Sequence, residues 1–114
     1  HSWPAEATLQ PQLPSTSAGF DGVVMVDDDD LDDGKPWWLI AWNNSTEGRT
    51  PLTLATSSDE GSTWEPLVNV EDGQGSFAYP FLLQSRRTTS TTHLCYSFDN
   101  GTMATMAYAR LNFT

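Results

Sequence analysis

An acidic run, interrupted only by Leu31, is the first candidate for metal chemistry in this sequence. The segment DDDDLDDG carries six carboxylates, and Asp28, Asp30 and Asp32 have the alternate spacing of the oxygen ligands in a calcium loop. However, Asp33 stands where such a loop turns on a glycine, and Leu39 stands where it supplies a bidentate glutamate. The alternative is a solvated hairpin tip, whose repelling charges protect a sheet edge from aggregation. This alternative is favoured, and no metal site is predicted.

A second stretch, SSDEGSTW, gathers a serine, an aspartate and a threonine in one short turn and could at first be an active-site loop. Each of its fixed residues, however, has a role in folding. Asp59 can accept backbone N–H bonds inside a tight turn, and Gly61 permits a positive φ. The hydroxyls of Ser57 and Thr63 can bond on either side of the turn. Trp64 begins the next apolar segment and can bury a large surface. The stretch therefore predicts a hairpin rather than chemistry.

The elements that must position these residues are short strands, because β-branched and alternating apolar segments are bounded throughout by turn residues. Pro66 places its own strand at a sheet edge. The last segment could be a helix by propensity, but it follows Asn100-Gly101, which is typical of a type I′ hairpin turn. The pattern predicts an antiparallel all-β fold. The predicted strands are Gly22–Val26, Pro36–Trp42, Leu52–Ser57, Trp64–Val70, Phe77–Gln84, Thr92–Phe98 and Met103–Leu111.

Length and charge restrict the classes of function. The 114 residues suffice for one domain, with residues 1–19 predicted as a Pro-containing extended connector and residues 20–114 as the folded part. The formal net charge is −10, from 15 acidic and 5 basic residues, which argues against binding nucleic acid or an anionic membrane surface. No apolar run approaches the roughly 18 residues of a membrane span. No cofactor is predicted.

Two features bear on the cellular compartment. Cys95 is the sole cysteine, so there is no internal disulfide framework. Glycosylation sequons begin at Asn43, Asn44, Asn100 and Asn112. They favour a secreted glycoprotein, at the cell surface or outside the cell. The alternative is that a chain rich in Ser, Thr and Asn forms such sequons by chance.

The turn described above also resembles a known family. Ser57-x-Asp59-x-Gly61-x-Thr63-Trp64 is similar to the Asp-box, or BNR, motif of sialidases and related β-propellers. In that family the motif is structural and also occurs in propellers without sialidase activity. The resemblance implies antiparallel four-stranded blades: one complete blade and most of a second, about one and three-quarter in this chain. A complete propeller would need further blades, from the same or another chain.

The resemblance extends to residues on both sides of the box. WNNSTEGRTPLTLATSSDEGSTW looks like the sialidase blade in which Arg49 is the third arginine of a triad that binds the substrate carboxylate, for which a guanidinium offers a bidentate fork. SFAYPFLLQ looks like the strand of the catalytic tyrosine, which makes Tyr79 the nucleophile. Asp21, at the start of a blade, is a candidate pocket carboxylate. Without the resemblance, Arg49 would be an ordinary loop residue and Tyr79 a core aromatic.

Departures from the family leave two functions open. Ser97 stands near the place of a glutamate that orients the first arginine, and Pro80 follows the tyrosine where a serine is usual. In family members, the first arginine, the acid/base aspartate and the glutamate that activates the tyrosine all come before these motifs in the sequence, and none of them is identifiable in this chain. One hypothesis is a glycoside hydrolase acting on acidic sugars; the other is a non-catalytic extracellular propeller that binds glycan or protein or builds a surface assembly. His93 is predicted as a strand residue, and the tryptophans Trp37, Trp38 and Trp42 as core rather than a sugar platform.

Overall fold

The structure is a computed structural model that describes residues 13–16, 18–26 and 35–113. The acidic run, residues 27–34, and most of the predicted connector lie outside the described residues, as does Thr114. The predictions made for the acidic run therefore stay predictions.

The described residues form strands and turns only, which confirms the predicted all-β, antiparallel class. Every predicted segment is a strand, with ends displaced by a residue at most. No helix in the described residues is long and apolar enough to cross a membrane. The strands are β1 (Asp21–Met25), β2 (Trp37–Asn43), β3 (Leu52–Ser57), β4 (Glu65–Glu71), β5 (Ser76–Gln84), β6 (Thr91–Asp99) and β7 (Ala104–Asn112).

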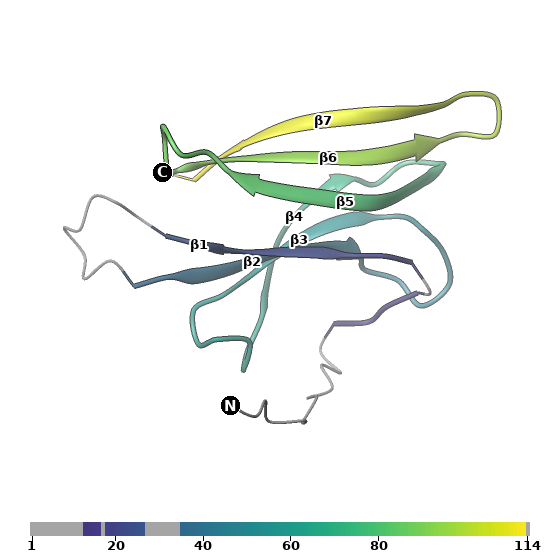
Figure 1. Cartoon of the computed structure of the whole chain (residues 1–114). Coiled ribbons are helices and arrows are strands. Elements are labelled where there is room, and N and C mark those ends of the chain that lie inside the picture. Colours follow the sequence, from purple (N-terminus) through teal and green to yellow (C-terminus); the bar gives the residue numbers. More distant parts are fainter. Residues whose placement is uncertain (1–12, 17, 27–34, 114) are drawn as a thin grey trace, which may run out of the picture.

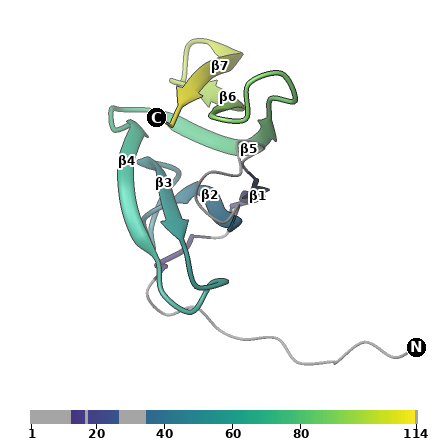
Figure 2. The ribbon, with the colours of Figure 1, turned by 90° about the vertical axis from the view of Figure 1, so that its left-hand side faces the viewer.

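The strands form two antiparallel sheets in simple up-and-down order, β1-β2-β3-β4 and β5-β6-β7. Figures 1 and 2 show the second sheet lying over the first, with β5 nearest to it. The β4 strand is an edge strand, as Pro66 predicts, since a proline cannot donate to a neighbour.

The core lies between the two sheets, because alternate residues of each strand point to the same face. One buried cluster combines residues from β1, β2 and β3 with residues from β5 and β6, so neither sheet's inner face is solvated. Its members are Met25, Leu39, Ala41, Leu52, Leu54, Phe77, Leu82, Leu94 and Tyr96. Burying such side chains contributes on the order of 1.5–3 kcal/mol each.

Polar clamps fix the sheets in register at both ends of β1. The Leu82 N–H donates to Asp21 Oδ2 at 2.8 Å. At the other end, Gln84 Nε2 donates to the Val26 carbonyl at 2.6 Å, and the Val26 N–H donates to Gln84 Oε1 at 3.2 Å. A third clamp joins β6 to β4, where the Tyr96 hydroxyl donates to Glu71. Together they set β5 against β1, which determines where the residues of β5 project.

The turn between β6 and β7 differs from the predicted type I′ turn. Gly101 has a φ of +91°, but Asn100 is not among the non-glycine residues with positive φ. The side-chain oxygen of Asn100 instead accepts N–H bonds from Thr102 and Met103. Asp99 pairs with Ala104, so the loop is longer than a two-residue turn, and the asparagine side chain takes over part of the hydrogen bonding.

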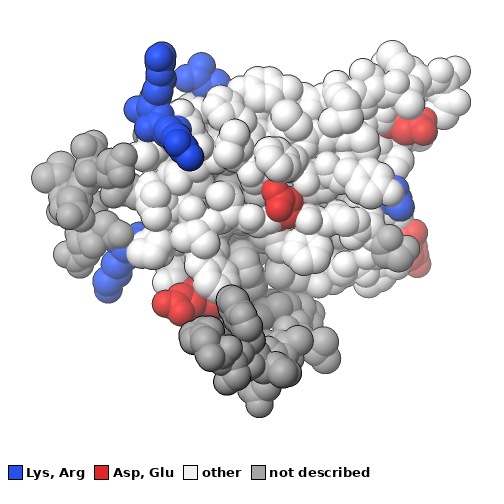
Figure 3. Space-filling view, viewed as in Figure 1, with Lys and Arg blue, Asp and Glu red and all other residues white. Residues whose placement is uncertain are grey.

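Charged side chains are sparse on the face of the molecule in Figure 3, and Lys and Arg gather at the end that holds the β5–β6 turn. Arg86 and Arg87 lie exposed in this turn, in agreement with their polar surroundings in the sequence. Six of the 15 acidic residues of the chain lie in the run outside the described part.

Candidate functional site

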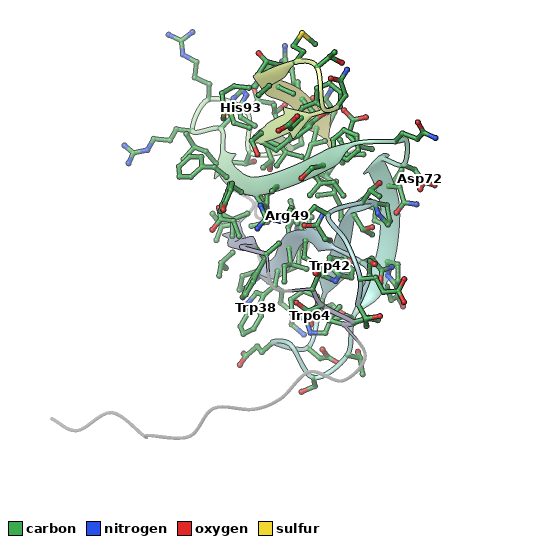
Figure 4. All side chains as sticks on the ribbon, turned by 90° about the vertical axis from the view of Figure 1, so that its right-hand side faces the viewer. Trp38, Trp42, Arg49, Trp64, Asp72 and His93 are labelled. Carbon is green, nitrogen blue, oxygen red and sulfur yellow. The ribbon has the colours of Figure 1, made fainter. Side chains whose placement is uncertain are left out.

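The structure brings Arg49 and Tyr79 together, although thirty positions and two strands separate them in the sequence. The guanidinium carbon of Arg49 lies 5.3 Å from the centre of the Tyr79 ring, within the range of a cation–π contact. Arg49 comes from the loop between β2 and β3, and Tyr79 from the middle of β5. Figure 4 shows Arg49 between the two sheets. The two residues therefore form one surface from two different sheets.

A β-bulge in β5 directs Tyr79 out of the core. Ala78 pairs with Ser97 and Phe81 pairs with Cys95, so two residues of β5, Tyr79 and Pro80, oppose a single residue of β6. Tyr79 has a φ of 53°, which is unusual for an aromatic residue. Its side chain is 62% exposed, so the alternative of a core aromatic is wrong. Bulges commonly re-aim a side chain beside a functional site.

The loop that carries Arg49 is fastened to the same part of β5. The Phe77 N–H donates to the carbonyl of Arg49 at 2.8 Å. The Ser97 hydroxyl donates to the Ala78 carbonyl at 3.0 Å, directly before the bulge. Thus the backbone on either side of the Arg49–Tyr79 contact is held by hydrogen bonds, and the pair is placed by the fold rather than by a flexible loop.

The polar groups of this pair are open to a ligand. In the part of the chain that the structure describes, no carboxylate pairs with the Arg49 guanidinium or bonds to the Tyr79 hydroxyl. An unpaired guanidinium keeps its planar fork free for a carboxylate. A phenol with no acid–base partner, in contrast, has no group among the described residues to take its proton.

Asp21 contacts the strand that carries Tyr79, but its carboxylate is already used in the fold. One of its carboxylate oxygens accepts the N–H of Leu82, which follows Tyr79 by three residues on β5. Asp21 therefore connects β1 to the strand that carries Tyr79. This predicted pocket residue therefore has a structural contact, and it lies beside β5, the strand that carries Tyr79.

The turn that opens onto β4 has the geometry its residue types require. The Gly61 N–H donates to the Ser57 hydroxyl, which donates in turn to Asp59. Asp59 also accepts from the backbone and the hydroxyl of Thr63. These bonds, led by that from the Thr63 hydroxyl, lower the pKa of Asp59 to about 2. Trp64 packs against Trp38 on the sheet. The polar groups of Ser57, Asp59, Gly61 and Thr63 bond to one another, so the turn is structural.

The other aromatic candidates separate into core and surface. Trp42 is buried, and its indole N–H donates to Pro14, so part of the predicted connector lies against β2. Trp38 packs on Trp64. Trp37 packs against the buried cluster and edge-on against Phe113, as predicted for a core residue, and it also lines a hollow of about 440 Å³ with Lys35, Glu65 and several hydroxyl residues. His93 lies on β6, as predicted, and its ring contacts the Tyr108 hydroxyl at 2.6 Å. Figure 4 places it far from Arg49.

The predicted glycosylation residues differ in access. Asn43 is only 3% exposed, and its Nδ2, the atom that would carry a sugar, donates to two carbonyls. A glycan there would require the side chain to leave the core. Asn44 is half-buried, and Asn100 and Asn112 are exposed. The structural role of Asn43 was not predicted, although the sequence offers one signal for it: an amide directly after a buried apolar segment.

Comparison with known proteins gives one match. A family model described as a BNR repeat-like domain matches residues 7–94, which is more than half of the chain and includes Arg49, the turn at Asp59 and Tyr79. No curated protein and no solved structure matches the chain.

Proposed function

The chain belongs to the BNR repeat-like family, and from this premise we propose that it is part of a secreted, sialidase-like propeller that acts on acidic-sugar glycans. The single observation that carries the proposal is the Arg49–Tyr79 pair, with the guanidinium 5.3 Å from the ring centre. Family membership supports a glycan-related role in general. The substrate and the activity are our proposals.

The two side chains fit different parts of an acidic sugar. The Arg49 fork would bind the sugar's carboxylate through two parallel hydrogen bonds. The Tyr79 oxygen would form a bond to the anomeric carbon as the glycosidic bond breaks. A neutral phenol suits this attack, because a carboxylate nucleophile would be repelled by the sugar's own charge. The family resemblance assigns the acid that protonates the leaving oxygen, and the base that takes the phenol proton, to segments that precede these motifs.

The outward face of the β5–β7 sheet supports the propeller. Phe81 and Leu83 on β5 and Met106 and Tyr108 on β7 are more than half exposed, and together they form an apolar sheet face. Apolar areas of this kind mark surfaces that another element covers. A further blade on this face would bury it in the same way that the β1–β4 sheet buries the other face. We propose that such blades come from the rest of the propeller.

The test of catalysis is the hydrolysis of a fluorogenic sialoside by the intact protein that carries this chain. We expect release of the fluorophore, and we expect Tyr79→Phe to abolish it while leaving the fold unchanged, because only the hydroxyl is lost. Arg87→Lys, in the exposed turn that follows β5, is the control and should keep full activity. Absence of release, or release that survives Tyr79→Phe, would reject the enzyme.

The second candidate, a glycan-binding propeller without catalysis, is favoured by a separate observation. The Tyr79 hydroxyl has no carboxylate partner among the described residues. The hollow of about 440 Å³ combines the Trp37 ring with Thr56, Ser58 and Lys35, which are groups that stack on and bond to sugars. Binding on a glycan array without turnover, weakened by Trp37→Ala, would support it; efficient turnover would remove it.

Secretion is part of the same proposal. Exposed sequon residues Asn100 and Asn112 support it, because an added glycan must project into solvent. Protein expressed through a secretory pathway should lose mass on treatment with an N-glycosidase, and Asn100→Gln should reduce that loss. An unchanged mass would remove this support.

A further inference from the structure

The side chain of Asn43 connects the two halves of the Arg49–Tyr79 pair. Its Nδ2 donates to the Phe77 carbonyl at 2.8 Å and to the Pro51 carbonyl at 3.1 Å. Phe77 precedes Tyr79 by two residues, and Pro51 follows Arg49 by two residues. One amide nitrogen therefore holds both backbone segments, each at a point two positions along the chain from a functional residue.

The burial of Asn43 and the unpaired state of its oxygen indicate that the amide nitrogen determines where the side chain lies. The residue is 3% exposed, and its Oδ1 has no hydrogen-bond partner among the described residues. Leaving a buried oxygen unpaired costs about 1–3 kcal/mol. The fold tolerates this cost at the end of β2, where Asn43 pairs with Leu52 of β3. What the asparagine supplies and a leucine cannot is the pair of N–H donors.

A backbone bond completes the connection. The Phe77 N–H donates to the Arg49 carbonyl, so Phe77 is held on one side by the Arg49 loop and on the other by Asn43. Both contacts lie directly before the bulge that exposes Tyr79. Any shift of the loop relative to β5 would therefore strain this set of bonds before it separated the guanidinium from the ring.

We propose that Asn43 is a positioning residue, which sets the distance between the Arg49 guanidinium and the Tyr79 ring by clamping their backbones together. The proposal rests on the proposed function, in which that distance places the carboxylate of the sugar next to the nucleophile. It also accounts for the burial of a residue whose sequence context predicts a glycan.

The test uses NMR of the intact protein that carries this chain, with labelled arginine side chains, and needs no ligand. The Tyr79 ring shifts the resonances of the Arg49 side chain through its ring current, and Tyr79→Leu provides the value without that ring. We expect Asn43→Ala to lose most of this ring-current shift while the remaining spectrum stays dispersed as in a folded sheet. Gln84→Ala is the matched control. Gln84 is also an amide that bonds to the backbone of a neighbouring segment, but its partner is Val26, directly after β1.

The outcomes separate the positioning role from a general structural one. Gln84→Ala should lower the thermal midpoint but keep the Arg49 shift, whereas Asn43→Ser, with one shorter donor, should give an intermediate shift. An Arg49 shift unchanged in Asn43→Ala, or equally lost in Gln84→Ala, would overturn the proposal. So would unfolding of both Asn43 variants, since the clamp would then serve the whole fold. A wild-type protein that binds no sialic acid would reject the proposed function and leave this comparison intact.

Discussion

At the scale of single residues, backbone conformation and hydrogen bonding decide what each side chain can do. Tyr79 is available to a ligand because a bulge and a positive φ turn it outward. Arg49 is available because no described carboxylate neutralises it. Asp59, in contrast, has its carboxylate satisfied within its own turn. We therefore propose the sugar chemistry for the first two residues, whereas the third has a structural role.

The pKa of Asp59 predicts how stability depends on acidity. Hydrogen bonds from the Thr63 hydroxyl, the Thr63 N–H and the Ser57 hydroxyl lower this pKa from 3.8 to about 2 in the folded chain. A carboxyl with a lowered folded-state pKa stabilises the fold above its unfolded value, and the contribution disappears as the pH falls through the folded value. Asp59→Asn should thus lower the thermal midpoint at neutral pH and differ progressively less from the wild type between about pH 4 and pH 2.

The control for this prediction is Glu60→Gln, which removes a charge from the adjacent exposed position of the same turn. Its difference from the wild type should be small and should not follow the same pH window. A constant difference between Asp59→Asn and the wild type down to pH 2 would show that the carboxylate's hydrogen bonds are not the cause.

At the scale of elements, the sheets are joined by a few polar clamps in addition to the apolar core. The Tyr96 hydroxyl donates to Glu71 from a buried position between β6 and β4. Burial first, and then the hydrogen bond and the charge of Glu71, raise the pKa of Tyr96 well above its ordinary range. The neutral phenol is therefore the form that the fold needs.

Tyr96→Phe should destabilise the chain by about 1.5–3 kcal/mol, because it leaves the Glu71 carboxylate without its donor. The measurement is denaturant unfolding near pH 8. Since the folded-state pKa is raised, the contribution should be complete below the ordinary tyrosine value of about 10 and decline only above it. Tyr108→Phe is the matched control, because that hydroxyl contacts His93 on the exposed face. Equal losses in both variants would contradict a specific role for the Tyr96–Glu71 clamp.

The sequence predicted the elements better than their connections. All strands follow from alternation and turn residues, since these are local properties of the chain. The bulge at Tyr79 does not follow, because it depends on the register of β5 against β6, which local sequence does not determine. The burial of Asn43 was missed for the same reason: its partners, Phe77 and Pro51, are close only after the two sheets pack. Family resemblance named Arg49 and Tyr79, and packing explains why they meet.

At the scale of the whole molecule, the described residues form an inner core and leave large apolar side chains exposed on the outer sheet faces. The β5–β7 sheet exposes Phe81, Leu83, Met106 and Tyr108 on the side away from the core. A blade-like sheet that is covered on one face only fits a piece of a larger stack, as repeat architectures bury each unit against its neighbours.

The isolated chain should therefore self-associate through this face. Sedimentation velocity should show assembly that increases with protein concentration, and Leu83→Lys combined with Met106→Lys should reduce it, because two charges would then be desolvated on contact. Substituting Val24→Lys on β1, exposed on the first sheet, tests whether the second outer face contributes. A wild-type chain that stays monomeric at high concentration would show that these faces are stable in water without a partner.

The most direct test of the central claim is the affinity for sialic acid, measured by calorimetry on the intact protein, with Arg49→Lys beside the wild type. The account predicts binding of the acidic sugar, no binding of its methyl ester, and an affinity at least about tenfold lower for Arg49→Lys, or about 1.4 kcal/mol, because lysine cannot form the bidentate contact. Equal affinity for the acid and the ester, or an affinity unchanged by Arg49→Lys, would contradict the claim that Arg49 and Tyr79 form a site for an acidic sugar.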